Sequence, residues 1–148
     1  MWPCENTPGS SWMKITADAN IFFAALIKDS TTRKLWFNGA LKLFAPEFLM
    51  QEFFKHTAAV KKKFSGTPEE FETLVEELLN QVELIPDKEL VPFLPAVASL
   101  VSDEKDWLYA ACALKEDTAI WSHDKELKKQ TRIQIYTTSE LIEKTGTL

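Results

Sequence analysis

The chain has 148 residues, of which 45% are hydrophobic and 26% charged, and its formal net charge is −5 at pH 7. This length and balance predict one globular domain with a substantial core and exclude a wholly disordered chain. The acidic balance gives no support to nucleic-acid binding, since proteins that bind phosphates are usually basic. It does not exclude RNA binding either, because four of the carboxylates, if they form a site together, account for most of the net charge.

The first residues of the chain and its cysteines bear on the cellular location of the protein. The first residues lack the basic and apolar regions of a signal peptide, and the chain has no apolar stretch of about 18 residues that would cross a membrane. Residues 1–12 are expected to form a loosely ordered extension, and residues 13–148 a single domain. Cys4 and Cys112 show no metal-binding or redox spacing. We therefore expect unlinked thiols and a cytoplasmic protein without membrane contact.

Strand and helix patterns alternate along the chain without a linker or an internal repeat. Strands are expected at residues 13–17, 42–45, 82–85, 119–122 and 133–137. Helices are expected at residues 20–28, within 32–41, from Pro46 to Phe64, and at 68–81, 104–115, 124–129 and 138–145. The segment 87–101 is helical in pattern but is expected to be short or bent, because Pro92 and Pro95 interrupt it.

The clearest local signal is a helix start at Thr67. Thr67 at the N-cap, Pro68 at the first helical position and Glu70 two residues later form a capping box. More broadly, strands joined by helices predict a parallel sheet that is covered on both faces. The carboxyl ends of such strands meet at one edge, which is where open α/β sheets bind ligands.

Four acidic residues lie where this edge would bring the connections together. Asp18 and Asp124 directly follow predicted strands, Asp106 precedes an apolar helical run, and Glu52 lies in the helix that begins at Pro46. Carboxylates from four connections would suit a hard divalent cation such as Mg²⁺ or Mn²⁺. Each residue taken alone has a simpler interpretation, as a turn former, a helix cap or a solvated glutamate. Glu47 is an alternative to Glu52.

Four pieces of the chain resemble, in order and spacing, the motifs of the PIN-domain nucleases. The pieces are ITADANIFFAAL, APEFLMQEF, DEKDWLYAACAL and AIWSHDKEL. The similarity is greatest to the VapC-like toxin ribonucleases and their archaeal-type relatives, and it covers residues 14–145. It implies a three-layer α/β/α sandwich around a five-stranded parallel sheet. It also implies a Mg²⁺ or Mn²⁺ site and metal-dependent cleavage of RNA.

The resemblance also assigns roles to individual residues. It implies catalytic and metal-binding roles for Asp18, Glu52, Asp106 and Asp124. It implies supporting roles for Asn20 and Ser122, which would hold the carboxylates in place by hydrogen bonds. The third acid has an alternative in Asp103. We favour Asp106 because it immediately precedes the apolar helix, and we expect Asp103 to be the N-cap with Asp106 at the third helical position.

Basic residues around Asp124 are candidates for binding the phosphates of the substrate. They are Lys125, Lys128, Lys129 and Arg132. The same residues could equally form the exposed side of a short helix. His56 and His123 lack the spacing of a metal-binding pair and are expected at the surface or beside the substrate.

These observations predict a metal-dependent endoribonuclease that cleaves RNA with a metal-activated water and needs no covalent nucleophile. One or two metal ions are equally compatible with the sequence, and so are a toxin paired with an antitoxin protein and an RNA-maturation nuclease. The alternative is a non-catalytic PIN-fold module that binds RNA or protein. A haloacid-dehalogenase-type phosphatase would need a second aspartate where Asn20 stands.

Adjacent phenylalanines suggest a second covered surface. Consecutive helical residues point about 100° apart, so both members of Phe22–Phe23 or Phe53–Phe54 cannot face one core stripe. We expect one member of each pair to cover either a sheet edge or a partner subunit in a homodimer. The alternative is a thick core in which the helices are buried on two sides.

Overall fold

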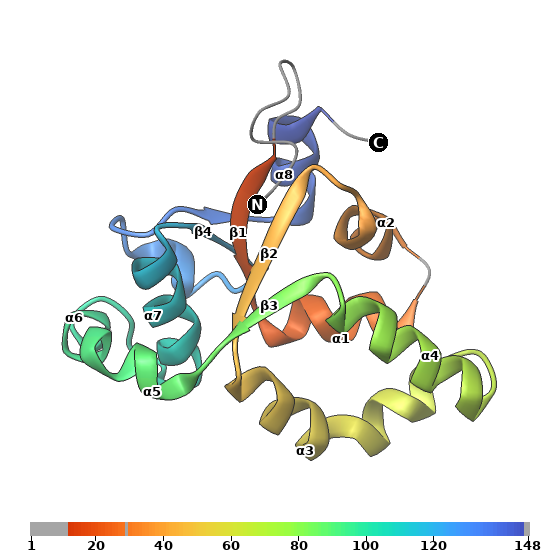
Figure 1. Ribbon diagram of the computed structural model, residues 1–148. Coiled ribbons are helices and arrows are strands. Elements are labelled where there is room, and N and C mark those ends of the chain that lie inside the picture. The colour runs from red at the N-terminus through yellow and green to blue at the C-terminus, as the bar shows by residue number, and fades with distance from the viewer. Residues whose placement is uncertain (1–11, 29, 147–148) are drawn as a thin grey trace.

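The computed structural model describes residues 12–28 and 30–146 (Figure 1). Five parallel strands form one sheet in the order β3-β2-β1-β4-β5. They span Met13–Ala17 (β1), Leu41–Pro46 (β2), Val82–Ile85 (β3), Ala119–Trp121 (β4) and Ile135–Tyr136 (β5). The predicted five-stranded parallel sheet is therefore confirmed.

Helices connect successive strands. The α-helices are Ala19–Ile27 (α1), Thr31–Phe37 (α2), Phe48–Lys63 (α3), Pro68–Leu79 (α4), Asp87–Leu90 (α5), Leu94–Ala98 (α6), Trp107–Glu116 (α7) and Thr138–Thr145 (α8). Short 3-10 turns are Val91–Phe93 (η2), Glu104–Asp106 (η3) and Leu127–Lys129 (η4). The capping box of α4 is present, with Thr67 and Glu70 each bonding the other's backbone.

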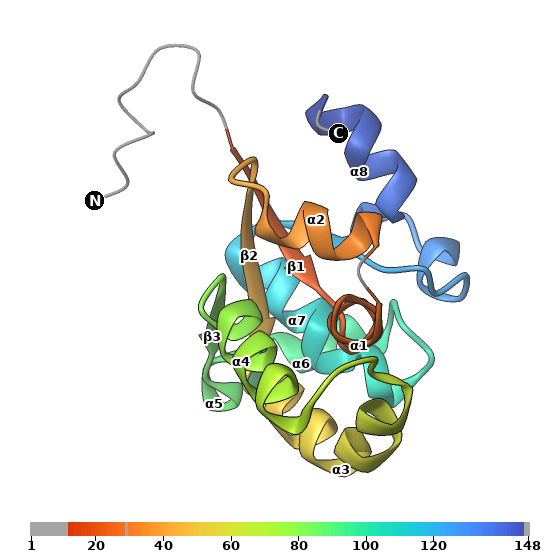
Figure 2. The same ribbon diagram turned by 90° about the vertical axis from the view of Figure 1, so that its right-hand side faces the viewer.

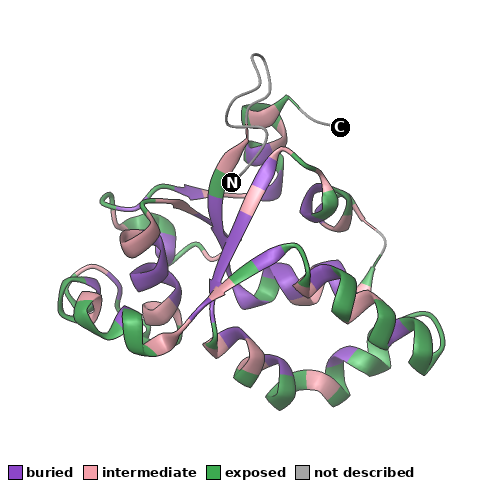
Figure 3. Ribbon diagram, in the orientation of Figure 1, coloured by how far each residue is buried: buried purple, intermediate pink, exposed green. Residues whose placement is uncertain are grey.

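The helices form a layer on each face of the sheet (Figures 1 and 2). Alternate strand residues point to opposite faces, so Leu43 and Trp121 join the core under α1–α4 and α8. Phe44 and Ile120 join the core under α5–α7. Buried residues concentrate along the central strands, whereas the outer side of α4 is exposed (Figure 3). The arrangement is the predicted three-layer sandwich.

Among the element boundaries that differ from the predicted ones, two lie on either side of β2. Pro46 ends β2 instead of starting a helix, and α3 begins at Phe48. A proline lacks the N–H that a sheet ladder uses, so the end of a strand tolerates it. Helix α2 stops at Phe37, and the side chain of Asn38 accepts a 2.8 Å hydrogen bond from the backbone N–H of Ala40. This turn leads directly into β2.

Of two other helical predictions, one is confirmed and one is shorter in the structure. The segment 87–101 is broken into α5, η2 and α6, as its prolines suggested. The predicted helix at 124–129 is reduced to the 3-10 turn η4. Residues 122–126 therefore form a loop, and this loop carries Asp124.

The strand order reverses between β1 and β4, which are neighbours although the chain reaches them far apart. Ala17 pairs with Trp121 at their carboxyl ends. The backbone N–H of Asp18 continues the pairing with a 3.2 Å hydrogen bond to the carbonyl of Trp121. Open α/β sheets bind their ligands at such a reversal point, and Asp18, Ser122 and Asp124 all follow these two strands.

Three predictions concern the ends of the chain and the thiols. The extension at residues 1–12 lies, apart from Trp12, outside the described residues, and so does Cys4. Cys112 is a buried free thiol, and burial raises its pKa to about 12. Across residues 12–28 and 30–146, no helix has the length and apolar character needed to span a membrane.

Candidate active site

A cleft of about 590 Å³ lies beside the ends of β1 and β4. All four predicted acids line it: Asp18, Glu52, Asp106 and Asp124. Asn20 and the alternative acid Asp103 line it as well. Glu47 lies elsewhere, where its Oε1 accepts a 3.2 Å hydrogen bond from the backbone N–H of Asp87. The structure therefore gathers in one cavity acids that come from four separate connections.

Asp18 lies at the bottom of this cleft and is only 5% exposed. It is the N-cap of α1, and its Oδ1 accepts a 3.0 Å hydrogen bond from the backbone N–H of Ile21. Burial raises the pKa of Asp18, although a hydrogen bond from Ser122 acts in the opposite direction. The cap uses one carboxylate oxygen and fixes the direction of the side chain.

Ser122 links Asp18 to the loop that carries Asp124. The serine is fully buried at the end of β4, and its hydroxyl acts on the carboxylate of Asp18, whose pKa it lowers. Its Oγ also accepts a 3.0 Å hydrogen bond from the backbone N–H of Asp124. The carboxylate of Asp124 accepts a 2.9 Å hydrogen bond from the backbone N–H of Glu126. One buried hydroxyl therefore contacts both strand-end acids.

Asp106 is the acid whose negative charge is least balanced by hydrogen bonds. It ends η3 directly before α7, and its Oδ2 is buried without a hydrogen-bond partner among the described residues. Burial and the adjacent carboxylate of Asp124 raise the pKa of Asp106 to about 7, with further contributions from Asp103 and Asp18. Asp103 is the N-cap of η3, where its Oδ1 accepts a 3.0 Å hydrogen bond from the backbone N–H of Lys105.

Glu52 reaches the cleft from α3 and is held there by Tyr109. The Tyr109 hydroxyl donates a 2.5 Å hydrogen bond to Oε1 of Glu52. Tyr109 is buried in α7, one turn after Asp106, and burial followed by the Glu52 carboxylate raises its pKa. Sequence reasoning missed this residue. Its only signal was an aromatic side chain one helical turn beyond a predicted ligand.

The donor set matches what a hard divalent cation requires. Carboxylate oxygens are the preferred ligands of Mg²⁺ and Mn²⁺. A buried oxygen without a partner among the described residues and a raised pKa on Asp106 indicate clustered negative charge that a cation would stabilise. In the part of the chain that the structure describes, however, no three acidic, histidine or cysteine side chains are positioned to hold one ion as they stand. A shared ion therefore requires carboxylate side chains to rotate.

The basic residues around Asp124 do not line this cleft. Lys128 forms a 2.8 Å ion pair with Glu140, and Lys129 forms a 2.9 Å ion pair with Glu126. Lys125 and Arg132 are exposed outside the cleft lining. The basic residues that do line it are Lys55, His56 and Lys105, none of which was predicted to bind substrate phosphates.

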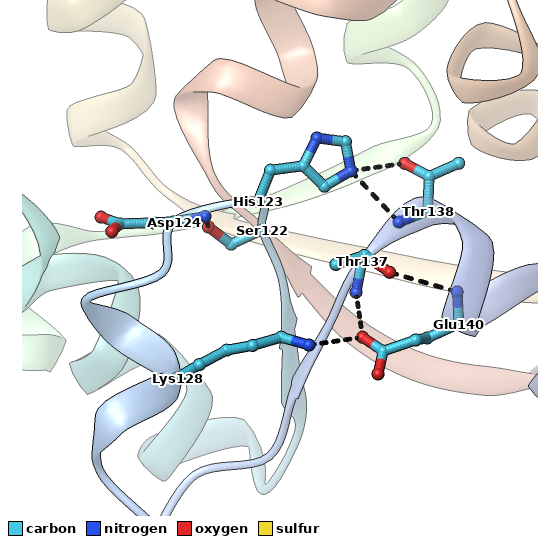
Figure 4. A network of polar contacts seen from close by, with 7 residues as sticks. All are labelled: Ser122, His123, Asp124, Lys128, Thr137, Thr138 and Glu140. Atoms are coloured by element: carbon cyan, nitrogen blue, oxygen red, sulfur yellow. Dashed lines mark hydrogen bonds and ion pairs between the residues drawn. The ribbon is translucent and has the colours of Figure 1, made fainter.

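The loop after β4 is fastened to α8 at two points (Figure 4). Nε2 of His123 accepts a 3.2 Å hydrogen bond from the backbone N–H of Thr138 and lies 3.1 Å from its hydroxyl. The second point is Lys128, whose partner Glu140 belongs to the capping box of α8. Asp124 lies between these two points in sequence and is directed away from α8 (Figure 4). The final helix therefore holds the loop that presents Asp124.

Comparisons with known proteins agree with this architecture. The VapBC2 complex of Rickettsia felis, solved bound to a DNA fragment from its promoter, contains a chain of similar fold. The TM-score is 0.65 at 14% sequence identity, and the match covers 84% of this chain and 98% of that chain. No curated protein matches the chain significantly. The family model described as PIN domain matches residues 16–143. The chain therefore belongs to the PIN domain family.

Proposed function

We propose that this protein is a metal-dependent endoribonuclease whose Asp18, Glu52, Asp106 and Asp124 bind Mg²⁺ or Mn²⁺. Membership of the PIN domain family supports nuclease activity, because PIN domains are generally nucleases. The observation that supports metal-dependent ribonuclease activity is the convergence of these four carboxylates in one cleft, at the point where the strand order of the sheet reverses. The buried, unpartnered Oδ2 of Asp106 adds to it, because a cation is its natural partner.

When bound, such a cation supplies a water of lowered pKa, orients the scissile phosphate and neutralises charge that develops on it. The chain's own residues prepare the site. Ser122 fixes the carboxylate of Asp18 and the backbone of Asp124, and Tyr109 fixes Glu52. Asn20 stands at the cleft wall, where its amide can hydrogen-bond a neighbouring carboxylate or the substrate. These hydrogen bonds restrain the carboxylates before the substrate binds, and the rotations that bring them onto a shared ion remain to be made.

The similar chain in the VapBC2 complex supports a biological setting. That complex is bound to DNA from its own promoter. We extend the proposal to the toxin of a toxin–antitoxin pair, with an antitoxin protein as partner. A small DNA-binding protein encoded beside this chain, and copurifying with it, is the expected result. Failure of that neighbour to bind the chain would remove the toxin assignment but leave the nuclease assignment intact.

A homodimer is part of the proposal on separate grounds. Phe53 is 6% exposed, whereas its neighbour Phe54 is 70% exposed on α3. Phe37, at the end of α2, is 38% exposed. Large apolar side chains at the surface favour a partner that covers them. Sedimentation equilibrium over a wide concentration range tests this, and a mass that stays at 16.9 kDa would contradict the dimer.

The ribonuclease activity is tested by incubating the purified protein with single-stranded and hairpin RNAs in Mn²⁺ or Mg²⁺. We expect cleavage that EDTA abolishes and that is absent in an Asp124→Asn variant prepared in parallel. Equal cleavage by the variant would assign the activity to a contaminant. Binding of RNA without cleavage on every substrate would support the non-catalytic alternative. The observation that favours this alternative is that, among the described residues, no three acidic, histidine or cysteine side chains are positioned to hold one ion.

A further inference from the structure

Two lysines line the acidic cleft from different elements. Lys55 lies on α3, one turn after Glu52, and Lys105 lies in η3 directly before Asp106. Both side chains are exposed, and neither forms an ion pair or a side-chain hydrogen bond with any of the described residues. Each lysine is therefore close in sequence to one of the candidate ligands, and its ammonium group is available to a ligand in the cleft.

The basic residues around Asp124 are placed differently. Lys128 and Lys129 are engaged by Glu140 and Glu126, and no residue of the set Lys125, Lys128, Lys129 and Arg132 contributes to the cleft wall. A phosphate held by this set would lie away from the four carboxylates. The positive charge that can act on a substrate in the cleft is therefore that of Lys55 and Lys105, with His56 beside Lys55.

The chemistry of the cleft explains why such charge is needed. Four carboxylates repel a polyanion, and a metal at their centre compensates this repulsion only at the scissile phosphate. The phosphates on either side of it need cations of their own, because contacts to phosphates supply most of the sequence-independent affinity for nucleic acid. Lysine suits this role as a point charge on a flexible stem.

The depth of the site indicates the form of the substrate. Asp18 is 5% exposed, so a scissile phosphate has to descend into the cleft to approach it. A flexible single strand can bend into such a cleft, whereas a stiff duplex keeps its backbone at the surface. Positively charged grooves that follow the backbone are the usual binding sites for single strands.

We propose that Lys55 and Lys105 bind the phosphates that flank the scissile phosphate of a single-stranded RNA, one on each wall of the cleft. This inference rests on the proposed ribonuclease function and adds to it the form of the substrate and the residues that position it. Both lysines act through charge and not through base contacts, so their contribution is the same for different RNA sequences.

The test measures binding separately from cleavage. Fluorescence anisotropy of a fluorescein-labelled single-stranded RNA oligonucleotide, in EDTA and over a series of KCl concentrations, gives the salt dependence of the dissociation constant. Each phosphate contact to a single strand contributes about 0.7 to the slope of log K against log salt concentration. The Lys55→Ala/Lys105→Ala variant is expected to lower that slope by about 1.4, for two lost contacts. It should weaken binding to every RNA sequence by a similar factor.

The matched control is Lys34→Ala/Lys88→Ala, which removes the same charge from exposed residues outside the cleft. The inference predicts a slope unchanged from that of the parent protein. A lowered slope in the control and an unchanged slope in the Lys55/Lys105 variant would overturn it, as would tighter binding to a duplex than to the single strand. Because the assay needs no turnover, a parent protein that binds RNA through these lysines but never cleaves it would contradict the ribonuclease proposal alone. Equal melting temperatures of all three proteins exclude misfolding as the cause of any difference.

Discussion

The hydroxyl of Tyr109 donates a 2.5 Å hydrogen bond to Oε1 of Glu52, across 57 residues of sequence. This contact joins α7 to α3 at the wall of the cleft. A buried phenol that holds a predicted ligand has the same role as the outer hydrogen bonds that orient ligands in known metal sites.

Replacing Tyr109 with phenylalanine tests that role. The ring keeps its place in the core, but Glu52 loses its fixed orientation. We expect metal affinity or cleavage rate to fall about 10- to 100-fold, the range for loss of such an orienting contact. Stability should fall by only about 1 kcal/mol. The Mn²⁺ concentration for half-maximal cleavage measures the effect. An unchanged Mn²⁺ dependence would show that the hydrogen bond does not position Glu52 for metal binding.

The raised pKa of Asp106 predicts how stability depends on pH in the absence of metal. Its pKa is about 7 in the folded protein against an ordinary value of 3.8. The folded state therefore retains a proton that the unfolded chain releases. The resulting stabilisation is complete below the unfolded pKa and is lost as the pH rises through about 7.

Urea unfolding in EDTA at about pH 5 and about pH 8 measures this loss. For a half-buried group screened by solvent we expect on the order of 1–2 kcal/mol. An Asp106→Asn variant should lack this part of the pH dependence. The pKa values of Asp18 and Asp87 are also raised, but both acids are present in both proteins, so the difference between the proteins isolates Asp106. Identical pH dependence in the two proteins would contradict the assignment.

The attachment of the Asp124 loop to α8 predicts a stability effect at Thr138. Its hydroxyl accepts a 3.0 Å hydrogen bond from Nε1 of the buried Trp121 and lies 3.1 Å from Nε2 of His123. Thr138→Val keeps the shape but leaves the indole N–H without a partner, which costs about 1–3 kcal/mol. The neighbouring exposed residue provides the control, since Ser139→Ala should change the free energy of unfolding by less than about 0.5 kcal/mol. Equal values for the two variants would show that the network does not stabilise this region.

The use of water as the nucleophile makes a prediction about the substrate. If the attacking oxygen came from the RNA itself, the 2′-hydroxyl next to the scissile bond would be indispensable and a 2′,3′-cyclic phosphate would form. We expect an RNA with a single 2′-deoxy residue at the cleaved position to be cut, and the products to lack a cyclic phosphate, as mass spectrometry can show. Cyclic phosphate ends, or resistance of the deoxy-substituted RNA alone, would point to attack by the RNA.

Local patterns sufficed for much of the fold. The bounds of β1 and β3 and the capping box at Thr67 were predicted correctly, because each depends on a short run of residues. Pro46 was placed wrongly at a helix start, since a proline suits both the first turn of a helix and the end of a strand. Pairing of β2 with β3 decides between the two, and pairing is a property of the whole sheet.

The site shows the same difference between features that local sequence determines and features that depend on packing. The acids that line the cleft were predicted from motif order, which the chain retains locally. Of the partners of these acids, Ser122 was implied by the resemblance, whereas Tyr109 was not predicted. Tyr109 meets Glu52, and Lys128 meets Glu140, only once separate elements have packed together. Lys55 and Lys105 had no signal in the sequence that distinguished them from other exposed lysines, and they gain significance only from the cleft that they share.

The central claim is that four acids from four connections act as one divalent-metal site. Calorimetric titration of Mn²⁺ into the metal-free protein tests it most directly. The variants are Asp18→Asn, Glu52→Gln, Asp106→Asn and Asp124→Asn, and Asp117→Asn is the control, because Asp117 is exposed and does not line the cleft. The account predicts binding by the parent and the control, and at least about tenfold weaker binding by each of the four variants, since each removes a charged ligand. No binding by the parent, or parent-like binding by the four variants, would contradict it.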